Sequence, residues 1–372
     1  MRLKSIYFIE NKGQPTEWEL KDLSLGAINL IVGKNATGKS RTLNIISHLA
    51  NIISGTPLLP GQTYYYKVVF DSEFETTYEL DVFNGVILTE KLIVSDNYKI
   101  IKGPTDSTTK VYFETIQSYL ESQFTPNFLC ASQRDIIQKP YLEPLFNWAL
   151  NTIHTRFGTP LGQNTLYLFA PDSEFLSDYK NVEAVSTHLK DAERKGIFEK
   201  LKSEIITDLK YIGYDVDDIG CVEAGIANNQ KVYKIFVKEK DIKVPVFQEN
   251  MSQGMFRAIS VIVHYNYIIL DNKKCCLLVD DIGEGLDFDR STSLIKKICE
   301  KAESAKYQII MTSNDRFVMN QVDLSYWSVL VRNGQSCRAI NKFNSESIFR
   351  KFKYTGLNNF DFFSTDFYQG AE

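Results

Sequence analysis

A glycine-rich loop between an apolar run and a helical pattern has the residue types that hold phosphate. Residues 28–40 read INLIVGKNATGKS, and Gly33, Gly38, Lys39 and Ser40 match the spacing G-x-x-x-x-G-K-[ST]. Glycines let several backbone N–H groups at a helix start point at one anion. Lys39 would reach the β and γ phosphates, and the Ser40 hydroxyl would ligate Mg²⁺. The sequence therefore predicts a nucleotide-binding loop.

Two adjacent carboxylates follow a second apolar run. Residues 275–279 read CCLLV, and Asp280 and Asp281 come directly after them. In parallel α/β sheets, ligands bind at the carboxyl ends of the strands. We expect Asp280 to hold Mg²⁺, directly or through water, and Asp281 to face the γ-phosphate and polarise the attacking water.

A second helix start has the character of an anion-binding surface. Met251-Ser252-Gln253-Gly254 precedes an apolar helical pattern, and Ser252 is a plausible N-cap. One ATP seldom needs two phosphate-binding helix starts within one chain. The sequence therefore predicts two chains that face each other head to tail, each supplying one of the two surfaces.

The composition limits the classes of protein to consider. The chain has 372 residues, of which 44% are hydrophobic and 24% charged, and its net charge of −4 gives no overall nucleic-acid footprint. No apolar run approaches the roughly 18 residues of a membrane span. Six cysteines occur without a C-x-x-C pair, and Cys275 and Cys276 lie in an apolar strand-like run. We interpret these two as reduced core thiols of a cytoplasmic protein.

Alternating strand and helix patterns must position these residues. Strands are expected over 2–10 and 17–32, antiparallel hairpins over 62–113, a further strand over 125–135 and a strand pair over 219–247. Helical patterns cover 42–53, 141–157, 171–213, 252–270 and 289–304, and strands are expected over 275–280, 307–312 and 327–333.

The order of the motifs GKNATGKS, MSQG, LLVDDIGEGLD and IIMTSND resembles the ABC-type ATPase heads of the Rad50/SMC/RecF group. Within it, the chain is most similar to AAA15/AAA21-like ATPases, OLD-type ATPases without the nuclease, many of which come from phage-defence operons. The resemblance covers most of the chain and implies an α/β P-loop head. It implies a β-rich N-terminal lobe (1–135) with Walker A, an inserted helical lobe (136–246), and a C-terminal lobe (247–372).

The resemblance implies ATP and Mg²⁺ as cofactors and assigns the motifs. Walker A is matched by Gly33–Ser40, the signature by Ser252–Gly254, Walker B by Cys276–Asp280, the D-loop by Gly285-Leu286-Asp287 and the Q-loop by Gln133. The cofactor-binding residues so implied are Gly33, Lys34, Asn35, Ala36, Thr37, Gly38, Lys39, Ser40, Arg41, Gln133, Ser252, Gln253, Gly254 and Asp287. The implied metal ligands are Ser40, Asp280 and Gln133.

Two departures from the family pattern concern hydrolysis. The family usually has Glu after the Walker B aspartate, where this chain has the shorter Asp281, and a switch histidine where it has Asn314. Asparagine can donate a hydrogen bond to a γ-phosphate but cannot become cationic. We expect Asp281 and Asn314 to be catalytic and ATP turnover to be slow.

Two functions remain open at this stage. One is a sensor or scaffold ATPase that pairs with itself and controls a separately encoded effector in antiviral defence. The other is a RecF- or Rad50-like repair ATPase that binds DNA, which the acidic balance does not favour. No heptad arm is visible, and we expect too few residues after Asn314 for a fused nuclease. The aromatic-rich segment 354–368 is expected to pack on the head, with partner docking as the alternative.

Overall fold

The computed structural model describes residues 1–156, 163, 167–169, 185–227, 230–271, 275–305 and 307–370. It divides into two compact units. The first comprises Met1–Thr152, Gln308–Thr312 and Asp323–Glu372, and the second Ile153–Tyr307 and Ser313–Val322. The three lobes expected from the sequence stay a prediction.

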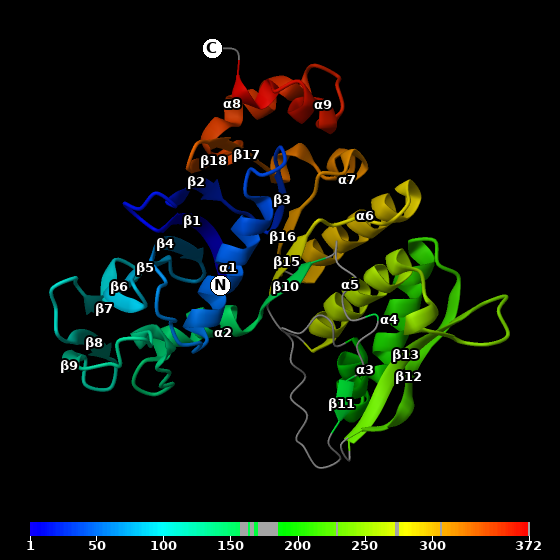
Figure 1. Cartoon of the computed structure of the whole chain (residues 1–372), viewed down its shortest axis with the longest axis horizontal. Coiled ribbons are helices and arrows are strands. Elements are labelled where there is room, and N and C mark those ends of the chain that lie inside the picture. The colour runs from blue at the N-terminus through cyan, green and yellow to red at the C-terminus, as the bar shows by residue number, and fades with distance from the viewer. Residues whose placement is uncertain are drawn as a thin grey trace. The chain divides into compact units, whose positions relative to one another are not determined.

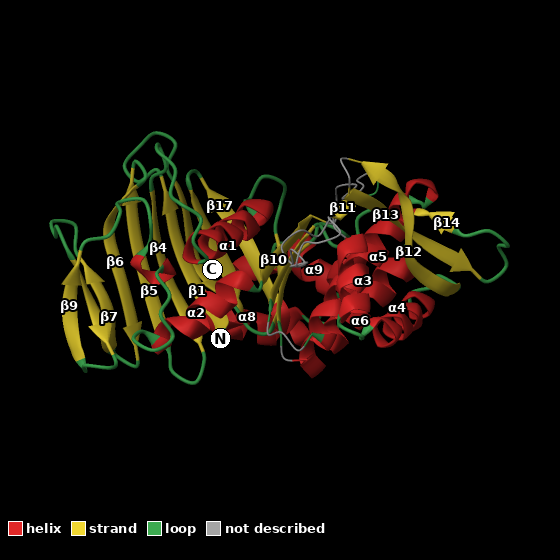
Figure 2. Cartoon of the chain, turned by 90° about the horizontal axis from the view of Figure 1, so that it is seen from below, coloured by secondary structure: helices red, strands yellow, loops and turns green. Residues whose placement is uncertain are grey.

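One mixed sheet dominates the first unit (Figures 1 and 2). Its strand order is β16-β3-β17-β18-β2-β1-β4-β5-β6-β7-β8-β9. β3 runs parallel to β16 and β17, whereas β4 to β9 form successive antiparallel hairpins, as predicted for 62–113. The strands are β1 (Arg2–Glu10), β2 (Trp18–Ser24), β3 (Ile28–Val32), β4 (Tyr64–Asp71), β5 (Thr76–Phe83), β6 (Val86–Val94), β7 (Asn97–Lys102), β8 (Thr109–Phe113), β9 (Ser118–Ser122), β16 (Gln308–Thr312), β17 (Trp327–Asn333) and β18 (Ser336–Asn341).

The two parts of this sheet bury their side chains differently. Every residue of β3 is buried, as expected for a parallel strand that is covered on both faces. β4 and β5 alternate between buried and more exposed positions, the pattern of a half-covered antiparallel sheet. The helices of the unit are α1 (Lys39–Ile53), α2 (Glu143–Leu150), α8 (Lys342–Lys353) and α9 (Asn359–Ser364), with 3-10 turns η1 (Cys130–Ser132), η2 (Pro140–Leu142), η4 (Leu324–Tyr326) and η5 (Phe367–Gln369).

The second unit combines a helical bundle with a small antiparallel sheet. The sheet has the order β11-β13-β12, β14 pairs with β13, and β10 is hydrogen-bonded to β15. α5 is buried along most of its length because most of its residues are apolar, and it packs against α3 and α4. The elements are β10 (Thr152–Arg156), β11 (Tyr167–Phe169), β12 (Val216–Ala227), β13 (Gln230–Glu239), β14 (Val246–Phe247), β15 (Cys276–Asp280), α3 (Val185–Arg194), α4 (Phe198–Tyr211), η3 (Gln248–Asn250), α5 (Gln253–Leu270), α6 (Phe288–Ala305) and α7 (Arg316–Gln321).

Three predicted elements differ from the structure. Residues 125–135 form turns and η1 instead of a strand, because the amides of Cys130 and Ala131 bond to the Glu90 carboxylate and not to a ladder. The helix expected over 141–157 ends at Leu150, and the β-branched stretch after it forms β10. Of the helix expected over 171–213, residues 171–184 lie outside the described residues, and Gly196, at φ 69°, separates α3 from α4.

Other expectations from the sequence are confirmed. Cys275 and Cys276 are both buried, and the cysteines are free thiols. The aromatic tail packs on its own unit, since Phe362 is fully buried against Phe349 and Phe352. None of the helices in the described ranges has the length and apolarity that crossing a membrane requires.

Candidate functional site

The predicted phosphate loop connects β3 to α1 and is built from its own backbone. The Thr37 amide and hydroxyl both donate to the Lys34 carbonyl, at 3.3 and 2.8 Å. One turn later, the Thr42 amide and hydroxyl both donate to the Gly38 carbonyl, at 2.8 and 2.9 Å. The loop is therefore a closed turn that opens directly into a helix, as the sequence predicts.

Both glycines of the motif are required by the geometry. Gly38 has φ +105°, and a Cβ there would lie 2.8 Å from the indole of Trp18. A Cβ at Gly33 would lie 2.6 Å from the Thr37 hydroxyl and 3.0 Å from the Leu330 carbonyl. Because real Cβ atoms do not approach other atoms so closely, any other residue would distort the loop.

The Lys39 ammonium group lies over the loop. Its side chain is only 7% exposed, and its Nζ donates to the carbonyls of Gly33 at 2.9 Å and Lys34 at 3.4 Å. α1 has no acidic residue in its first turn, so the helix dipole and the lysine add to one positive field. An anionic ligand could take over these hydrogen bonds from the carbonyl oxygens, and Ser40 beside it is exposed.

Neighbouring strands and the tail hold the outer side of the loop. Arg332 donates to the Ala36 carbonyl at 3.0 Å, and the Cys337 thiol donates to the Thr37 carbonyl at 3.1 Å. Lys34 forms an ion pair with Asp366, with 3.2 Å between Nζ and Oδ1. A hydrogen bond from Tyr368, followed by the contact with Lys34, lowers the pKa of the Asp366 carboxyl. The loop is thus held on its outer side by side chains of β17, β18 and the tail.

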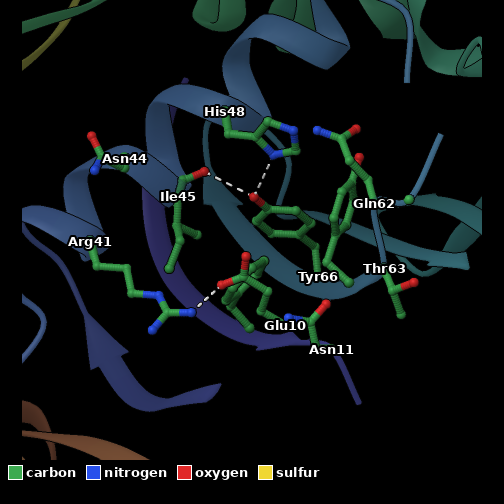
Figure 3. Close-up of a pocket in the computed structure, with 12 residues that line it drawn as sticks. Glu10, Asn11, Arg41, Asn44, Ile45, His48, Gln62, Thr63 and Tyr66 are labelled. Carbon is green, nitrogen blue, oxygen red and sulfur yellow. Dashed lines mark hydrogen bonds and ion pairs between the residues drawn. The ribbon is translucent and has the colours of Figure 1, made fainter. Parts of the chain in front are cut away.

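A pocket of about 540 Å³ lies along α1 beyond the loop (Figure 3). Arg41, Asn44 and His48 enter it from α1 at helical spacing, and Arg41 pairs with Glu10 and stacks on Trp18 at 4.3 Å. It is lined by Phe8, Glu10, Asn11, Arg41, Asn44, Ile45, His48, Gly61, Gln62, Thr63, Tyr64 and Tyr66. Of these residues, only Arg41 is predicted from the sequence to bind the cofactor; the spacing of polar residues along one face of α1 is the signal that points to the others.

Two tyrosines and a histidine give this pocket its polar interior. Tyr66 donates its hydroxyl hydrogen to the Ile45 carbonyl at 3.1 Å and lies 2.9 Å from His48 Nδ1. Burial lowers the pKa of His48, so its imidazole is neutral at neutral pH. The Tyr64 hydroxyl is buried and finds no hydrogen-bond partner among the described residues. The wall of the pocket therefore contains a buried hydroxyl without a partner among the described residues.

The acidic turn after β15 belongs to the second unit. Asp280 ends the strand at 7% exposure, and Asp281 adopts the left-handed conformation with φ 52°. Ser313 fixes the turn by donating its hydroxyl to the Ile282 carbonyl at 3.2 Å. A cavity of about 350 Å³ is lined by Asp281, Ile282, Glu284, Gly285, Ser313, Asn314 and Asp315. The structure thus brings Asp281 and Asn314 to one cavity.

The predicted signature helix packs directly on this turn. Ser252 caps α5 by accepting a hydrogen bond from the Met255 amide at 3.2 Å, as predicted. A Cβ at Gly254 would lie 2.6 Å from the Gly285 carbonyl, so the two backbones touch. Arg257, buried on α5, donates to the Glu284 carbonyl at 3.0 Å. Arg257 was not singled out from the sequence, because one arginine on an apolar helix carries no motif.

The remaining predicted residues have local roles here. Asp287 accepts the Arg290 amide at 3.0 Å and pairs with its guanidinium, which caps the start of α6. Gln253 is exposed at the start of α5. Gln133 is exposed in the first unit, where its carbonyl accepts a hydrogen bond from Lys139.

The described residues do not contain three or more His, Cys, Asp or Glu side chains grouped to hold a metal. A Mg²⁺ ion that is bound with a nucleotide needs no such group, since one or two protein oxygens, phosphate and water complete its shell. The exposed Ser40 hydroxyl and the carboxylate of Asp280 are oxygen donors of that type.

Known structures provide the comparison for this fold. Neither a family model nor a curated protein matches the chain. An SMC head bound to the C-terminal winged-helix domain of ScpA aligns with TM-score 0.52 and 11% identity, over 91% of this chain and 98% of that chain. A second structure is an SMC head from Pyrococcus furiosus with an extended coiled coil, bound to the C-terminal domain of ScpA. It aligns with TM-score 0.47 and 10% identity, over 95% of this chain and 99% of that chain. The SMC head of Thermotoga maritima aligns with TM-score 0.44 and 12% identity, over 92% of this chain and 99% of that chain. The first alignment shows an α/β fold of the SMC-head type and confirms the predicted α/β fold class.

Proposed function

We propose that the chain is an ABC-type ATPase head that binds and slowly hydrolyses ATP. The observation that carries this proposal is the loop before α1. There the buried Lys39 ammonium lies against a backbone turn whose geometry requires glycine at positions 33 and 38. The amides of the first helical turn and this cation form an anion site matched to the β and γ phosphates.

The pocket along α1 would take the nucleoside. It begins beside Arg41, the residue after Ser40, so a ligand with its phosphates on the loop would extend along the helix into it. A base there would meet the side chains of Phe8 and Tyr66. The Arg41–Glu10 pair would border the ribose and the α-phosphate.

The reaction would use oxygen and amide groups of both motifs. In this proposal Ser40, Asp280 and Gln133 would hold Mg²⁺, Asp281 would orient the attacking water, and Asn314 would donate a hydrogen bond to the γ-phosphate. Their common cavity supports the pairing of Asp281 with Asn314. The short Asp281 side chain and the uncharged Asn314 support slow turnover.

A second copy of the chain would complete each site. The capped start of α5, with Ser252, Gln253, Gly254 and the adjoining Asp287, is a second anion-binding helix start that the first nucleotide does not need. We propose that ATP joins two heads, each contributing its loop to one nucleotide and its α5 start to the other.

Within the cell, the chain would act as a nucleotide-dependent switch. Slow hydrolysis suits a protein with two states that differ in partner affinity better than it suits sustained mechanical work. We propose a sensor or scaffold that controls a separate effector protein in phage defence, with DNA repair as the alternative. The ScpA complexes of the SMC heads support protein partners for this type of fold.

Sedimentation velocity with and without a non-hydrolysable ATP analogue tests the pairing. We expect the unmodified chain to associate with the analogue, and Ser252→Arg to bind nucleotide but remain monomeric. Ser203→Arg, at an exposed site on α4, is the matched control and should associate. If Ser252→Arg assembles like the unmodified chain, the paired site is wrong.

The switch role needs a cellular test. The chain is expressed alone and together with its genetic neighbours in cells challenged by phage, and the complexes are purified and weighed. We expect protection only with a neighbour present and a nucleotide-dependent complex with it. Full protection by the chain alone, or DNA cutting by the pure chain, would contradict this role. DNA affinity that falls steeply with salt would favour repair.

A further inference from the structure

A fully buried carboxylate on strand β6 binds a distant stretch of backbone. Glu90 is 1% exposed, and its Oε2 accepts the Cys130 amide at 2.8 Å while its Oε1 accepts the Ala131 amide at 2.8 Å. The Tyr78 hydroxyl, from strand β5, donates to Oε1 at 3.0 Å. Three donors from two separate parts of the first unit therefore meet on one side chain.

A buried carboxylate of this kind lowers the stability of the fold, so stability does not explain its presence. Burial raises the pKa of Glu90, and the backbone and tyrosine hydrogen bonds oppose this shift only in part. Its described contacts include no ion pair within 4.0 Å. Strand positions that face the core of an antiparallel sheet ordinarily hold apolar residues, so the carboxylate must be explained by the backbone that it holds.

The segment that Glu90 holds leads directly into Gln133. Cys130 and Ala131 belong to η1, and the Gln133 amide donates to the Cys130 carbonyl at 3.0 Å. On the other side, the buried Lys139 donates its ammonium to the Gln133 carbonyl. The main chain of Gln133 is thus fixed from both directions, while its side chain is exposed.

We propose that Glu90 is a positioning residue that sets the place of Gln133 for catalysis. This inference rests on the proposed ATPase function, in which Gln133 ligates the nucleotide-bound Mg²⁺. Because Glu90 and Tyr78 belong to β6 and β5, the carboxylate ties the Gln133 segment to the antiparallel part of the sheet. The β-rich strands would thereby control turnover without touching the nucleotide.

Two conservative substitutions separate this role from simple stabilisation. In Glu90→Gln, the amide offers one acceptor and one donor to two N–H groups, so one backbone N–H faces another donor and the segment must shift. Tyr78→Phe is the matched control, since it removes a hydrogen bond to the same carboxylate but leaves both backbone contacts. Thermal unfolding is measured for each variant, so that the loss of stability is known separately.

The test is a double-mutant cycle between Glu90→Gln and Gln133→Ala, with kcat and nucleotide affinity measured separately. We expect Glu90→Gln to lower kcat about 10- to 100-fold, as a misplaced catalytic group does, with nucleotide affinity nearly unchanged. Gln133→Ala should give a similar loss, and the double variant should be no slower than the slower single variant. Tyr78→Phe should reduce the melting temperature but keep kcat.

Three results would overturn the inference. The first is an equal loss of kcat from Glu90→Gln in the Gln133→Ala background, and the second is an equal loss of kcat from Tyr78→Phe, because in either case Glu90 would act through stability. The third is full activity of Gln133→Ala, which removes Gln133 from the site. The proposed function would survive each of these results, since it depends on nucleotide binding by Lys39, which is measured independently.

Discussion

The phosphate loop and the acidic turn achieve their geometry in different ways. The loop closes mainly on its own backbone, because Lys39 donates to the Gly33 and Lys34 carbonyls and Thr37 donates to the Lys34 carbonyl. Distant residues hold only its outer side. The acidic turn is assembled from segments far apart in sequence, because Gly254 and Arg257 come from α5 and Ser313 from the stretch before α7.

This difference separates the roles that we assign to them. A loop that closes on its own backbone can keep its shape when the acidic turn changes. A turn held by a neighbouring helix start can respond when that helix start engages a partner. We therefore expect changes in the loop to alter nucleotide affinity, and changes in the turn to alter turnover and association.

The largest effect should come from the turn. Asp281→Asn keeps the side-chain shape and tolerates the positive φ of this position, but it removes the carboxylate that orients water. We expect a fall in kcat of about 100-fold or more with ATP affinity unchanged, measured by phosphate release and nucleotide titration. Asp289→Asn, at an exposed site nearby, is the control. An equal loss of ATP binding would remove Asp281 from the catalytic role.

The next largest effect should come from the loop. Lys39→Ala removes a charged group that donates hydrogen bonds to the phosphates. Because charge-assisted hydrogen bonds are worth about 1.5–3 kcal/mol, the affinity for ATP should fall by about 10- to 100-fold. Isothermal titration with ATP and Mg²⁺ measures this loss, and the exposed Lys67→Ala on β4 should bind normally. Unchanged affinity in Lys39→Ala would make the loop an ordinary strand–turn–helix connection.

A smaller change tests whether the turn depends on α5. Gly254→Ala places a Cβ against the Gly285 carbonyl and should cost about 1–3 kcal/mol of local strain. We expect several-fold weaker ATP-dependent association with nearly normal ATP affinity, measured by sedimentation. Gly26→Ala, whose Cβ would meet its nearest atom at 3.9 Å, is the control. If association is unaffected, the contact between α5 and the turn is passive packing.

The smallest effect concerns the tail beside the loop. Asp366→Asn removes a negative charge that pairs with Lys34, so ATP should bind about threefold more tightly at low ionic strength and the gain should fade with salt. The pKa of Asp366 is lowered, so the carboxylate stays charged at neutral pH and its effect disappears only as pH falls through that pKa. The gain should vanish in a Lys34→Ala background; if it persists there, Lys34 does not mediate it.

The sequence predicts these regions unequally for a physical reason. The strand, glycine loop and helix start around Lys39 could be predicted because these residues lie within one short motif whose spacing is characteristic. The hairpins of the β-rich part also followed from the alternation of apolar and polar residues. Asp280, Asp281 and Asn314 were found because each follows an apolar strand.

What the sequence could not show depends on contacts between distant segments. Arg257 and Glu90 each bond to backbone groups far along the chain, and neither sits in a recognisable motif. The Glu90 contact also explains why 125–135 was wrongly predicted as a strand. The pocket with Tyr64 and His48 draws on β1, α1 and the approach to β4, so no single stretch reveals it.

The most direct test of the paired nucleotide site is complementation between two inactive chains. Lys39→Ala chains keep a normal α5 start but lack the loop cation. Ser252→Arg chains keep the loop cation but have an altered α5 start. A mixed pair contains one intact site, built from the loop of one chain and the α5 start of the other. We predict that mixing the two variants restores ATP hydrolysis that neither shows alone, with a dependence on both concentrations. If each variant is inactive and the mixture stays inactive at every ratio, although the chains associate, the nucleotide site is not shared between copies.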